Sequence, residues 1–299
     1  MVVTLSAFRY HEKGSGIEEV ERYPRSRQLS PESGKVDYGV ILGMIGKKQV
    51  GVLFGRDPLF AVKLAARLLL APEVLVNLLA GRTEDMPVQY YEIGRDLLLK
   101  YNRIRFEREY SDTAAIDFGT LKEMLGKDHG PHYRQRSVVK WNSFLYTVCR
   151  IMRPETVVET GVYWGFSSTH ILEALGPGGT GRLHSIDLTP ERLVSRGLTS
   201  GVIVPERHRD EWDLRLGESR TLLPELLTSL RTVDIFIHDS EHTYDNMMFE
   251  YRTAWPHIRK GGLLVSHDVS SDSGPFPDFA DEKGINYHVR DMIGFAVKN

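Results

Sequence analysis

The second half of the chain alternates short apolar runs with helical segments, and this alternation limits the folds that it can adopt. From Thr156 onward the apolar runs read TVVET, GRLHSIDL, WDLRLG, VDIFIHD and GGLLVSHDV. The helical segments between them begin near Ser167, Pro190, Ser219 and Tyr244. Alternating strands and helices predict βαβ units, in which helices cover both faces of a parallel sheet. We therefore predict an α/β fold with a doubly wound parallel sheet.

The remainder of the chain predicts additions to this sheet. The final residues, INYHVRDMIGFAVKN, predict an antiparallel hairpin that closes one edge. Residues 1–130 predict an N-terminal extension that serves as a lid, an oligomer contact or both, and residues 131–299 predict the sheet domain. The expected elements before the sheet are a poorly ordered arm over the first ~35 residues, a hairpin over residues 36–54, and helices over Pro58–Ala80, Val88–Arg108 and Val138–Met152. A polar segment, Lys127–Ser137, precedes the last of these helices.

Composition excludes several classes of function. The chain has 299 residues and a formal net charge of −2, so it lacks the clustered basic excess of a nucleic-acid-binding protein. Its most apolar stretch, Leu59–Ala80, contains Lys63, Arg67 and Glu73, whereas a membrane span needs about 20 mostly apolar residues. The single cysteine, Cys149, can form neither an internal disulfide nor a zinc-binding cysteine cluster. We expect a cytoplasmic homo-oligomer that acts on small molecules, without nucleic-acid or membrane partners.

A glycine-containing turn follows the first predicted strand. In VVETGVYWGFSSTHILEAL, Gly161 ends the strand and Gly165 precedes the helix that begins near Ser167. Glycine allows a tight turn and the close approach of a ligand, and the free N–H groups of the helix face that ligand. The turn lacks the Gly-Lys-Ser/Thr of a phosphate loop and the G-x-S-x-G of a nucleophile elbow. It also lacks the G-x-G-x-x-G of a dinucleotide site, where Tyr163 and Trp164 would crowd a pyrophosphate.

The pattern E-x-G-x-x-x-G-x-S, from Glu159 to Ser167, resembles the cofactor loop of class I S-adenosylmethionine-dependent methyltransferases. Members of that family have a seven-stranded Rossmann-like sheet. The next strand ends in Asp187, 26 residues after Gly161, where a carboxylate can accept hydrogen bonds from both ribose hydroxyls. The third strand ends in Gly217, Glu218 and Ser219, which look like the family's adenine-contacting turn.

This resemblance implies S-adenosylmethionine as the cofactor and a set of residues that bind it. Glu159, Gly161 and Ser167 would face the methionine part of the cofactor. Asp187 would hold the ribose, and Ser219 would border the adenine. The complete expected set is Glu159, Gly161, Tyr163, Gly165, Ser167, Asp187, Ser219 and Asp239.

Titratable residues follow the fourth and fifth predicted strands. DSEHTYD supplies Asp239 and His242, and VSHDV supplies His267 and Asp268. The tips of neighbouring strands bring these side chains toward the place where the transferred methyl would lie. The match DSEHTYD…AWPHIRKGGLLVSHD resembles the metal-dependent sugar and natural-product O-methyltransferases, which include cephalosporin-hydroxylase-like and macrolide sugar O-methyltransferase relatives. The resemblance covers roughly Pro131–Val269.

The narrower resemblance implies catalytic roles. Asp239, His267 and Asp268 would hold a divalent metal, Mg or Mn, and His242 would be the general base. A hard cation can bind two vicinal hydroxyls and lower the pKa of one, and a histidine near neutrality can accept that proton. Many relatives have an acid at position 267, and imidazole suits Zn, Mn, Fe or Ni better than Mg. Either the metal is a softer one, or His267 is not a ligand and only Asp239 and Asp268 bind the metal. A role for His267 as a second base is a further alternative.

The predicted function is S-adenosylmethionine-dependent methyl transfer, with metal-assisted O-methylation of a hydroxyl on a sugar or secondary metabolite. Asp239 and His242 are the expected catalytic residues. Two alternatives remain open. A metal-dependent hydroxylase-like relative would bind redox-active iron and consume oxygen. A non-catalytic, methyltransferase-like interaction module would not bind S-adenosylhomocysteine.

Overall fold

The structure is a computed structural model that describes residues 88–126, 133–176 and 181–299, without the side chains of residues 89, 90, 93, 97 and 133–139. All of these residues lie in the second of two compact units, Tyr38–Asn299. The expected N-terminal arm, the hairpin over residues 36–54, the helix Pro58–Ala80 and the start of the polar segment Lys127–Ser137 lie outside the described residues.

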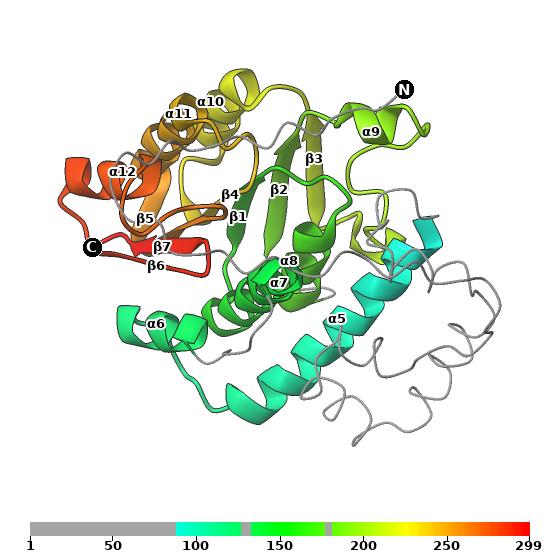
Figure 1. Ribbon diagram of the computed structural model, residues 1–299, viewed down its shortest axis with the longest axis horizontal. Coiled ribbons are helices and arrows are strands. Elements are labelled where there is room, and N and C mark those ends of the chain that lie inside the picture. Colours follow the sequence, from blue (N-terminus) through cyan, green and yellow to red (C-terminus); the bar gives the residue numbers. More distant parts are fainter. Residues whose placement is uncertain (1–87, 127–132, 177–180) are drawn as a thin grey trace, which may run out of the picture. The chain divides into compact units, whose positions relative to one another are not determined.

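Seven strands form one sheet at the centre of this unit (Figure 1). Their order is β3-β2-β1-β4-β5-β7-β6, and the first five strands along the chain run parallel. The last two form a hairpin in which β7 pairs antiparallel with β5. The strands are β1 (Thr156–Thr160), β2 (Arg182–Asp187), β3 (Trp212–Leu216), β4 (Val233–His238), β5 (Ile258–Ser266), β6 (Tyr287–Arg290) and β7 (Ile293–Val297). The predicted α/β sheet and its closing hairpin are confirmed.

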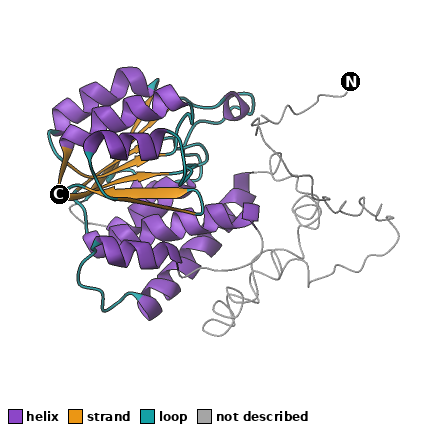
Figure 2. Ribbon diagram, turned by 60° about the vertical axis from the view of Figure 1, so that its left-hand side comes forward, coloured by secondary structure: helices purple, strands orange, loops and turns teal. Residues whose placement is uncertain are grey.

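Helices cover both faces of the sheet (Figure 2). One layer contains α5 (Val88–Glu109), α6 (Phe118–Gly126), α7 (Tyr133–Met152) and α8 (Phe166–Leu175), and the other contains α10 (Ser219–Leu230), α11 (Tyr244–Ala254) and α12 (Pro275–Lys283). Three short helices are α9 (Glu191–Val194), η2 (Glu206–His208) and η3 (Trp255–His257). Within the described ranges, every helix is too short or too polar to span a bilayer.

The central strands are apolar on both faces because each face packs against a helical layer. In β4, Ile235 and Ile237 belong to the core on one side of the sheet and Phe236 to the core on the other. Leu263 and Leu264 of β5 divide in the same way. Strands buried on both faces read as continuous apolar runs instead of alternating ones, which is why these segments are visible in the sequence.

Two helices were not predicted from the sequence, and a third begins earlier than expected. The segment that forms α12 contains two prolines, yet Pro275 occupies the first turn, where its missing N–H costs nothing. Gly284 ends that helix in the left-handed conformation. The helix α6 is only 9 residues long. The helix α7 begins at Tyr133 and not at Val138.

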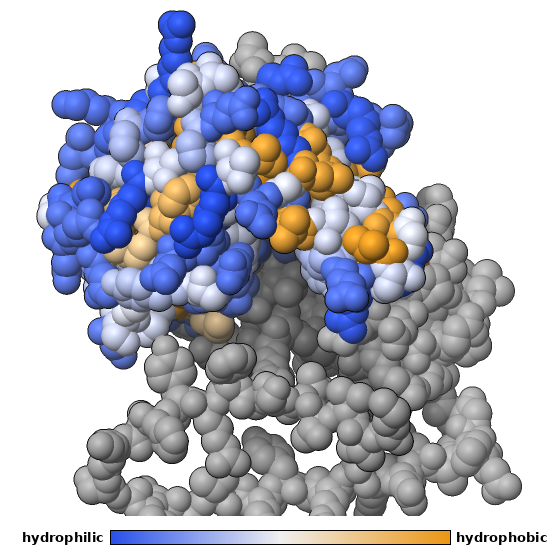
Figure 3. Space-filling model, turned by 90° about the horizontal axis from the view of Figure 1, so that it is seen from above, coloured by the Kyte–Doolittle hydropathy of each residue, from blue (hydrophilic) through white to orange (hydrophobic). Residues whose placement is uncertain are grey.

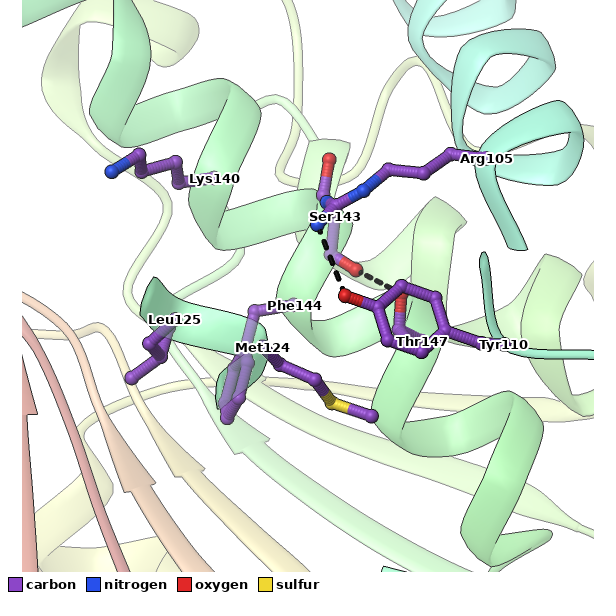
Figure 4. Close-up of a pocket in the computed structure, with 8 residues that line it drawn as sticks. All are labelled: Arg105, Tyr110, Met124, Leu125, Lys140, Ser143, Phe144 and Thr147. Carbon is purple, nitrogen blue, oxygen red and sulfur yellow. Dashed lines mark hydrogen bonds between the residues drawn. The ribbon is translucent and has the colours of Figure 1, made fainter. Parts of the chain in front are cut away.

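The helices α5, α6 and α7 meet around a small cavity of about 10 Å³ (Figure 4). Beside it, Nη2 of Arg105 donates to the hydroxyl of Tyr110 over 3.3 Å, and Oγ1 of Thr147 donates to the carbonyl of Ser143 over 2.7 Å. The volume suits a single water molecule. The helix α5 therefore packs closely against the sheet domain, and the boundary expected at residues 130 and 131 remains a prediction.

Candidate functional site

The loop from β1 to α8 has a backbone that demands glycine at two positions. Gly161 and Gly165 have φ angles of 86° and 96°, in the left-handed region that favours glycine. A Cβ atom on Gly161 would lie 2.0 Å from the carbonyl oxygen of Asp239. A Cβ on Gly165 would lie 2.7 Å from Cγ2 of Val204. The loop is thus pressed against the end of β4 on one side and the segment around Val204 on the other.

A cavity of about 610 Å³ opens at the carboxyl ends of the parallel strands, a volume typical of small-molecule sites. Five of the residues predicted to bind the cofactor line it, and these are Gly161, Tyr163, Asp187, Ser219 and Asp239. Figure 3 looks onto this end of the molecule, where apolar side chains gather within a hydrophilic surface. Leu188 lines the cavity and is 65% exposed, and Leu216 ends β3 and is 55% exposed. The cavity is therefore lined by polar residues together with the exposed apolar side chain of Leu188.

Asp187 is held by the glycine-containing loop itself. The backbone N–H of Tyr163 donates to Oδ2 of Asp187 over 3.1 Å, and the hydroxyl of Ser200 donates to the same oxygen. Tyr163 adopts a φ of 51°, which is uncommon for a residue other than glycine. Both bonds end on Oδ2, so Oδ1 of this carboxylate is left for a ligand in the cavity.

Glu159 lies behind the loop and not in the cavity. It has no exposed surface, and the hydroxyls of Ser168 and Ser185 donate to its Oε2 over 2.6 and 2.9 Å. Burial raises the pKa of Glu159 to about 7, although the hydroxyls of Ser167, Ser168 and Ser185 act to lower it. Glu159, Gly165 and Ser167 do not line the cavity. The position of Glu159 thus supports a role beneath the loop and gives no support to the expected contact with methionine.

The tips of β4 and β5 bring four predicted residues together. Nδ1 of His267 lies 3.1 Å from Oδ1 of Asp239, and Nε2 of His242 lies 3.6 Å from that oxygen. Asp268 is next to them, with Oδ1 at 3.5 Å from Nδ1 of His267 and Oδ2 at 3.9 Å from Nε2 of His242. One ligand atom from each of Asp239, His242 and His267 fits within 4.8 Å of the others. This set contains His242, whereas the sequence analysis expected Asp268 in its place.

The pKa values of His267 and Asp239 depend on the neighbouring charges in this cluster. Burial alone would lower the pKa of His267, but the carboxylates of Asp239 and Asp268 raise it above its usual value. Burial would raise the pKa of Asp239, but His242 and His267 lower it. The indole of Trp141, in α7, packs against the His267 ring with centroids 4.8 Å apart. A protonated imidazole or a cation is therefore favoured beside Asp239.

A buried carboxylate that the sequence analysis missed supports the same strand tips. Glu250 has no exposed surface and receives hydrogen bonds from the hydroxyl of Ser240 over 2.8 Å and from the amide of Asn246 over 3.1 Å. Nδ1 of His238 lies 2.6 Å from Oε2 of Glu250, and Thr160 also donates to that oxygen. The spacing of Asn246 and Glu250, four residues apart on α11, puts both on one face and is the signal that could have revealed this network.

Comparison with known proteins agrees with this geometry. Residues 158–269 match the model of a family described as a methyltransferase domain. No curated protein sequence matches the chain.

Among solved structures, an O-methyltransferase from Bacillus cereus in complex with SAH is 16% identical over 64% of this chain and 96% of its own, with a TM-score of 0.40. A putative caffeoyl-CoA O-methyltransferase from Staphylococcus aureus is 11% identical over 68% of this chain and 100% of its own, with a TM-score of 0.43. The MycE methyltransferase from the mycinamycin biosynthetic pathway, in complex with Mg and SAH, is 18% identical over 62% of this chain and 55% of its own, with a TM-score of 0.40. At these scores the likenesses add no weight to the family match.

The family match runs from Val158, within β1, to just past the end of β5, and it includes the ends of β1, β2, β3 and β4 that line the cavity. It contains the glycine-containing loop, Asp187 and the whole cluster around Asp239. The resemblance and the enzyme class that the motifs predict are confirmed at this level. Residues 158–269 of this chain thus match a methyltransferase domain, as the motifs predict.

Proposed function

We propose that this protein transfers a methyl group from S-adenosylmethionine to a hydroxyl of a small-molecule acceptor, a sugar or a secondary metabolite. The observation that carries the proposal is the convergence of the tips of β1, β2 and β3 on one cavity. In this assignment Oδ1 of Asp187 accepts hydrogen bonds from the ribose, and Ser219 borders the adenine. The exposed Leu188 supplies an apolar surface suited to the adenine ring, since planar rings pack well on aliphatic side chains.

The reaction is an in-line displacement. The acceptor oxygen forms a bond to the methyl carbon while the bond from that carbon to the sulfonium sulfur breaks, and the hydroxyl proton leaves. We assign His242 as the base that takes the proton, because its side chain is 32% exposed and Nε2 faces both Asp239 and Asp268. Proton transfer to a positioned histidine contributes about 10²–10⁴-fold to the rate of such reactions. Holding donor and acceptor in line supplies much of the remainder.

The cluster at β4 and β5 fits a divalent cation. Asp239 and His267 are the ligands shared by the set that the sequence analysis expected and the set that the geometry favours. Ligand atoms 3.1 and 3.6 Å apart are compatible with one ion, because bonds of about 2.1 Å place neighbouring ligands about 3 Å apart. A mixed nitrogen and oxygen donor set suits Mn or Zn better than Mg. When bound, such an ion would polarise an acceptor hydroxyl and lower its pKa.

One observation favours a second candidate. Asp239, His242 and His267 form a group of two imidazoles and one carboxylate, a donor set typical of non-haem iron(II) oxygenases. This keeps the hydroxylase-like alternative in competition with methyl transfer. Metal analysis of the purified protein, followed by oxygen consumption in the presence of iron(II), would favour it if both results were positive.

Titration of S-adenosylhomocysteine into the wild type and into Asp187→Ala, measured by calorimetry, tests the proposed function. The wild type should bind, and the substitution should weaken binding more than about tenfold, or 1.4 kcal/mol. Arg108→Ala is the control, because Arg108 lies at the end of α5, pairs with Glu109 and does not line the cavity. Absence of binding to the wild type, with or without Mn, would contradict the proposal and favour the interaction-module alternative.

A further inference from the structure

The N-terminal part of α5 packs on the back of the glycine-containing loop. The ring of Tyr91 stacks on Trp164 with centroids 3.8 Å apart and planes inclined by 16°. Both residues are buried, and with Leu193 and Ile203 they form a separate small core outside the two cores that flank the sheet. Because α5 precedes the family match at residue 158, this contact joins the methyltransferase domain to a segment that the domain itself does not contain.

A second contact from α5 reaches the segment that follows α9. The guanidinium of Arg95, which is 8% exposed, donates from Nη1 to the carbonyl of Ile203. That segment is itself bonded to the loop, because the N–H of Ile203 donates to the carbonyl of Trp164 over 3.2 Å and the N–H of Gly201 to that of Tyr163 over 2.8 Å. The helix α5 therefore contacts both the glycine-containing loop and the segment around Ile203, and these two segments are hydrogen-bonded to each other.

The same two segments supply the hydrogen bonds to Asp187. Tyr163 donates from its backbone N–H and Ser200 from its hydroxyl. Tyr163 donates while it holds a φ of 51°, a strained conformation for a residue other than glycine that persists only when surrounding contacts enforce it. The stack at Trp164, the next residue, is such a contact.

We propose that α5 braces the cofactor site, with Tyr91 and Arg95 as positioning residues that fix the loop and the carboxylate of Asp187 without touching the cofactor. This inference rests on the proposed function. Neither residue lines the cavity, so their effect on cofactor affinity has to pass through Trp164 and Ile203. Without the brace, all of the residues predicted to contact the cofactor are still present. A smaller fraction of molecules, however, holds the loop and Asp187 in the conformation that binds the cofactor.

Calorimetry with S-adenosylhomocysteine tests the brace through matched variants. Tyr91→Ala should weaken binding about fivefold or more, while Tyr91→Phe keeps the stacked ring and should bind within about twofold of the wild type. Arg108→Ala, at the far end of the same helix, should bind as the wild type does. If the wild type binds and Tyr91→Ala binds equally well, the brace is refuted and the proposed function stands. If the wild type does not bind, the proposed function has failed.

Hydrogen exchange of the wild type provides a test that does not depend on a variant's folding. Coupling between two sites is reciprocal, so saturating S-adenosylhomocysteine should slow amide exchange in residues 88–99 as well as in the loop 161–165. Residues 100–109 of the same helix serve as the internal comparison and should change less. Slower exchange in the loop with unchanged exchange in residues 88–99 would overturn the inference.

Discussion

The two halves of the cavity end of this protein are built by different means. The proposed cofactor half, at the tips of β1, β2 and β3, is shaped by backbone, with left-handed φ angles at Gly161, Tyr163 and Gly165 and the carboxylate of Asp187 bonded to the loop. The acceptor half, at the tips of β4 and β5, is shaped by titratable side chains that lie within hydrogen-bond or ion-pair distance of one another.

The difference separates binding from chemistry. A backbone cradle presents the same shape at every pH, which suits a ligand that has to be held in one orientation. A cluster of imidazoles and carboxylates changes its charge with pH and with metal, which suits proton transfer. A substitution in one half should therefore impair the function of that half and leave the other intact.

The largest effect is expected from Gly161→Ala, in the cofactor half. The added Cβ would lie 2.0 Å from the carbonyl oxygen of Asp239, at a φ of 86°. Because that neighbour is backbone, the loop or the end of β4 has to move, and we expect a loss of about 4 kcal/mol or more in the free energy of unfolding. Denaturant unfolding measures this loss.

Gly176→Ala is the matched control for this clash. Gly176 has a φ of 82°, and no heavy atom among the described residues lies within 4 Å of its added Cβ. Gly176→Ala therefore introduces backbone strain without a steric clash, and we expect it to lower the free energy of unfolding by about 1–2 kcal/mol. Equal losses for the two variants would show that the close approach of Gly161 to Asp239 contributes nothing.

His242→Ala should break the acceptor half alone. We expect kcat to fall by about 10²–10⁴-fold, because the proposed base is lost, while the affinity for S-adenosylhomocysteine stays within about twofold. Manganese titration of the same variant separates the two roles that the geometry allows. Unchanged manganese affinity supports His242 as the base, whereas a loss that matches that of His267→Ala makes it a metal ligand.

The smallest effect concerns the buried carboxylate behind each half. The pKa of Glu159 is raised to about 7 by burial, so the folded state binds more protons than the unfolded state between about pH 4.5 and pH 7. The free energy of unfolding of the wild type therefore falls as pH rises through this window. Glu159→Gln removes that dependence. Its free energy of unfolding, relative to that of the wild type, should therefore rise by about 1–3 kcal/mol between pH 5 and pH 8.

Glu250→Gln provides the contrast from behind the acceptor half. Burial would raise the pKa of Glu250, but His238 lowers it below its usual value. Its charged form thus stabilises the fold above the unfolded pKa, and this contribution is lost only as pH falls below that value. The variant should be less stable than the wild type at both pH 5 and pH 8. If the free energy of unfolding of Glu250→Gln, relative to the wild type, rose with pH as that of Glu159→Gln is expected to, the pKa values of the two carboxylates would not be shifted in opposite directions.

The sheet and the cofactor half could be predicted from the sequence because their signals are local. Strands buried on both faces leave apolar runs, and the turn at Gly161 leaves its glycines in a fixed spacing. The helix α12 was missed because its two prolines read as a break, although Pro275 begins the helix.

At the tips of β4 and β5, the sequence predicted which residues lie together but not their full arrangement. Strand order brings Asp239 and His267 together, but which of His242 and Asp268 lies nearer to them depends on loop conformation. The network of Glu250 and His238 depends on packing between α11 and β4, which no short motif records. The contacts of Tyr91 and Arg95 could not be read from the sequence either, since their partners lie far along the chain.

The bond from Arg95 to Ile203 spans 108 positions in the chain, and this span has a consequence for folding kinetics. A contact between distant residues forms only after a large loop has closed, and loop closure costs conformational entropy. Such contacts therefore form slowly relative to local ones. The glycine turn and the β-strand next to it can form early from neighbouring residues. If α5 braces the cofactor site, that site becomes competent only when residues near position 90 have met those near position 200, which makes ligand binding during refolding a reporter of this long-range contact.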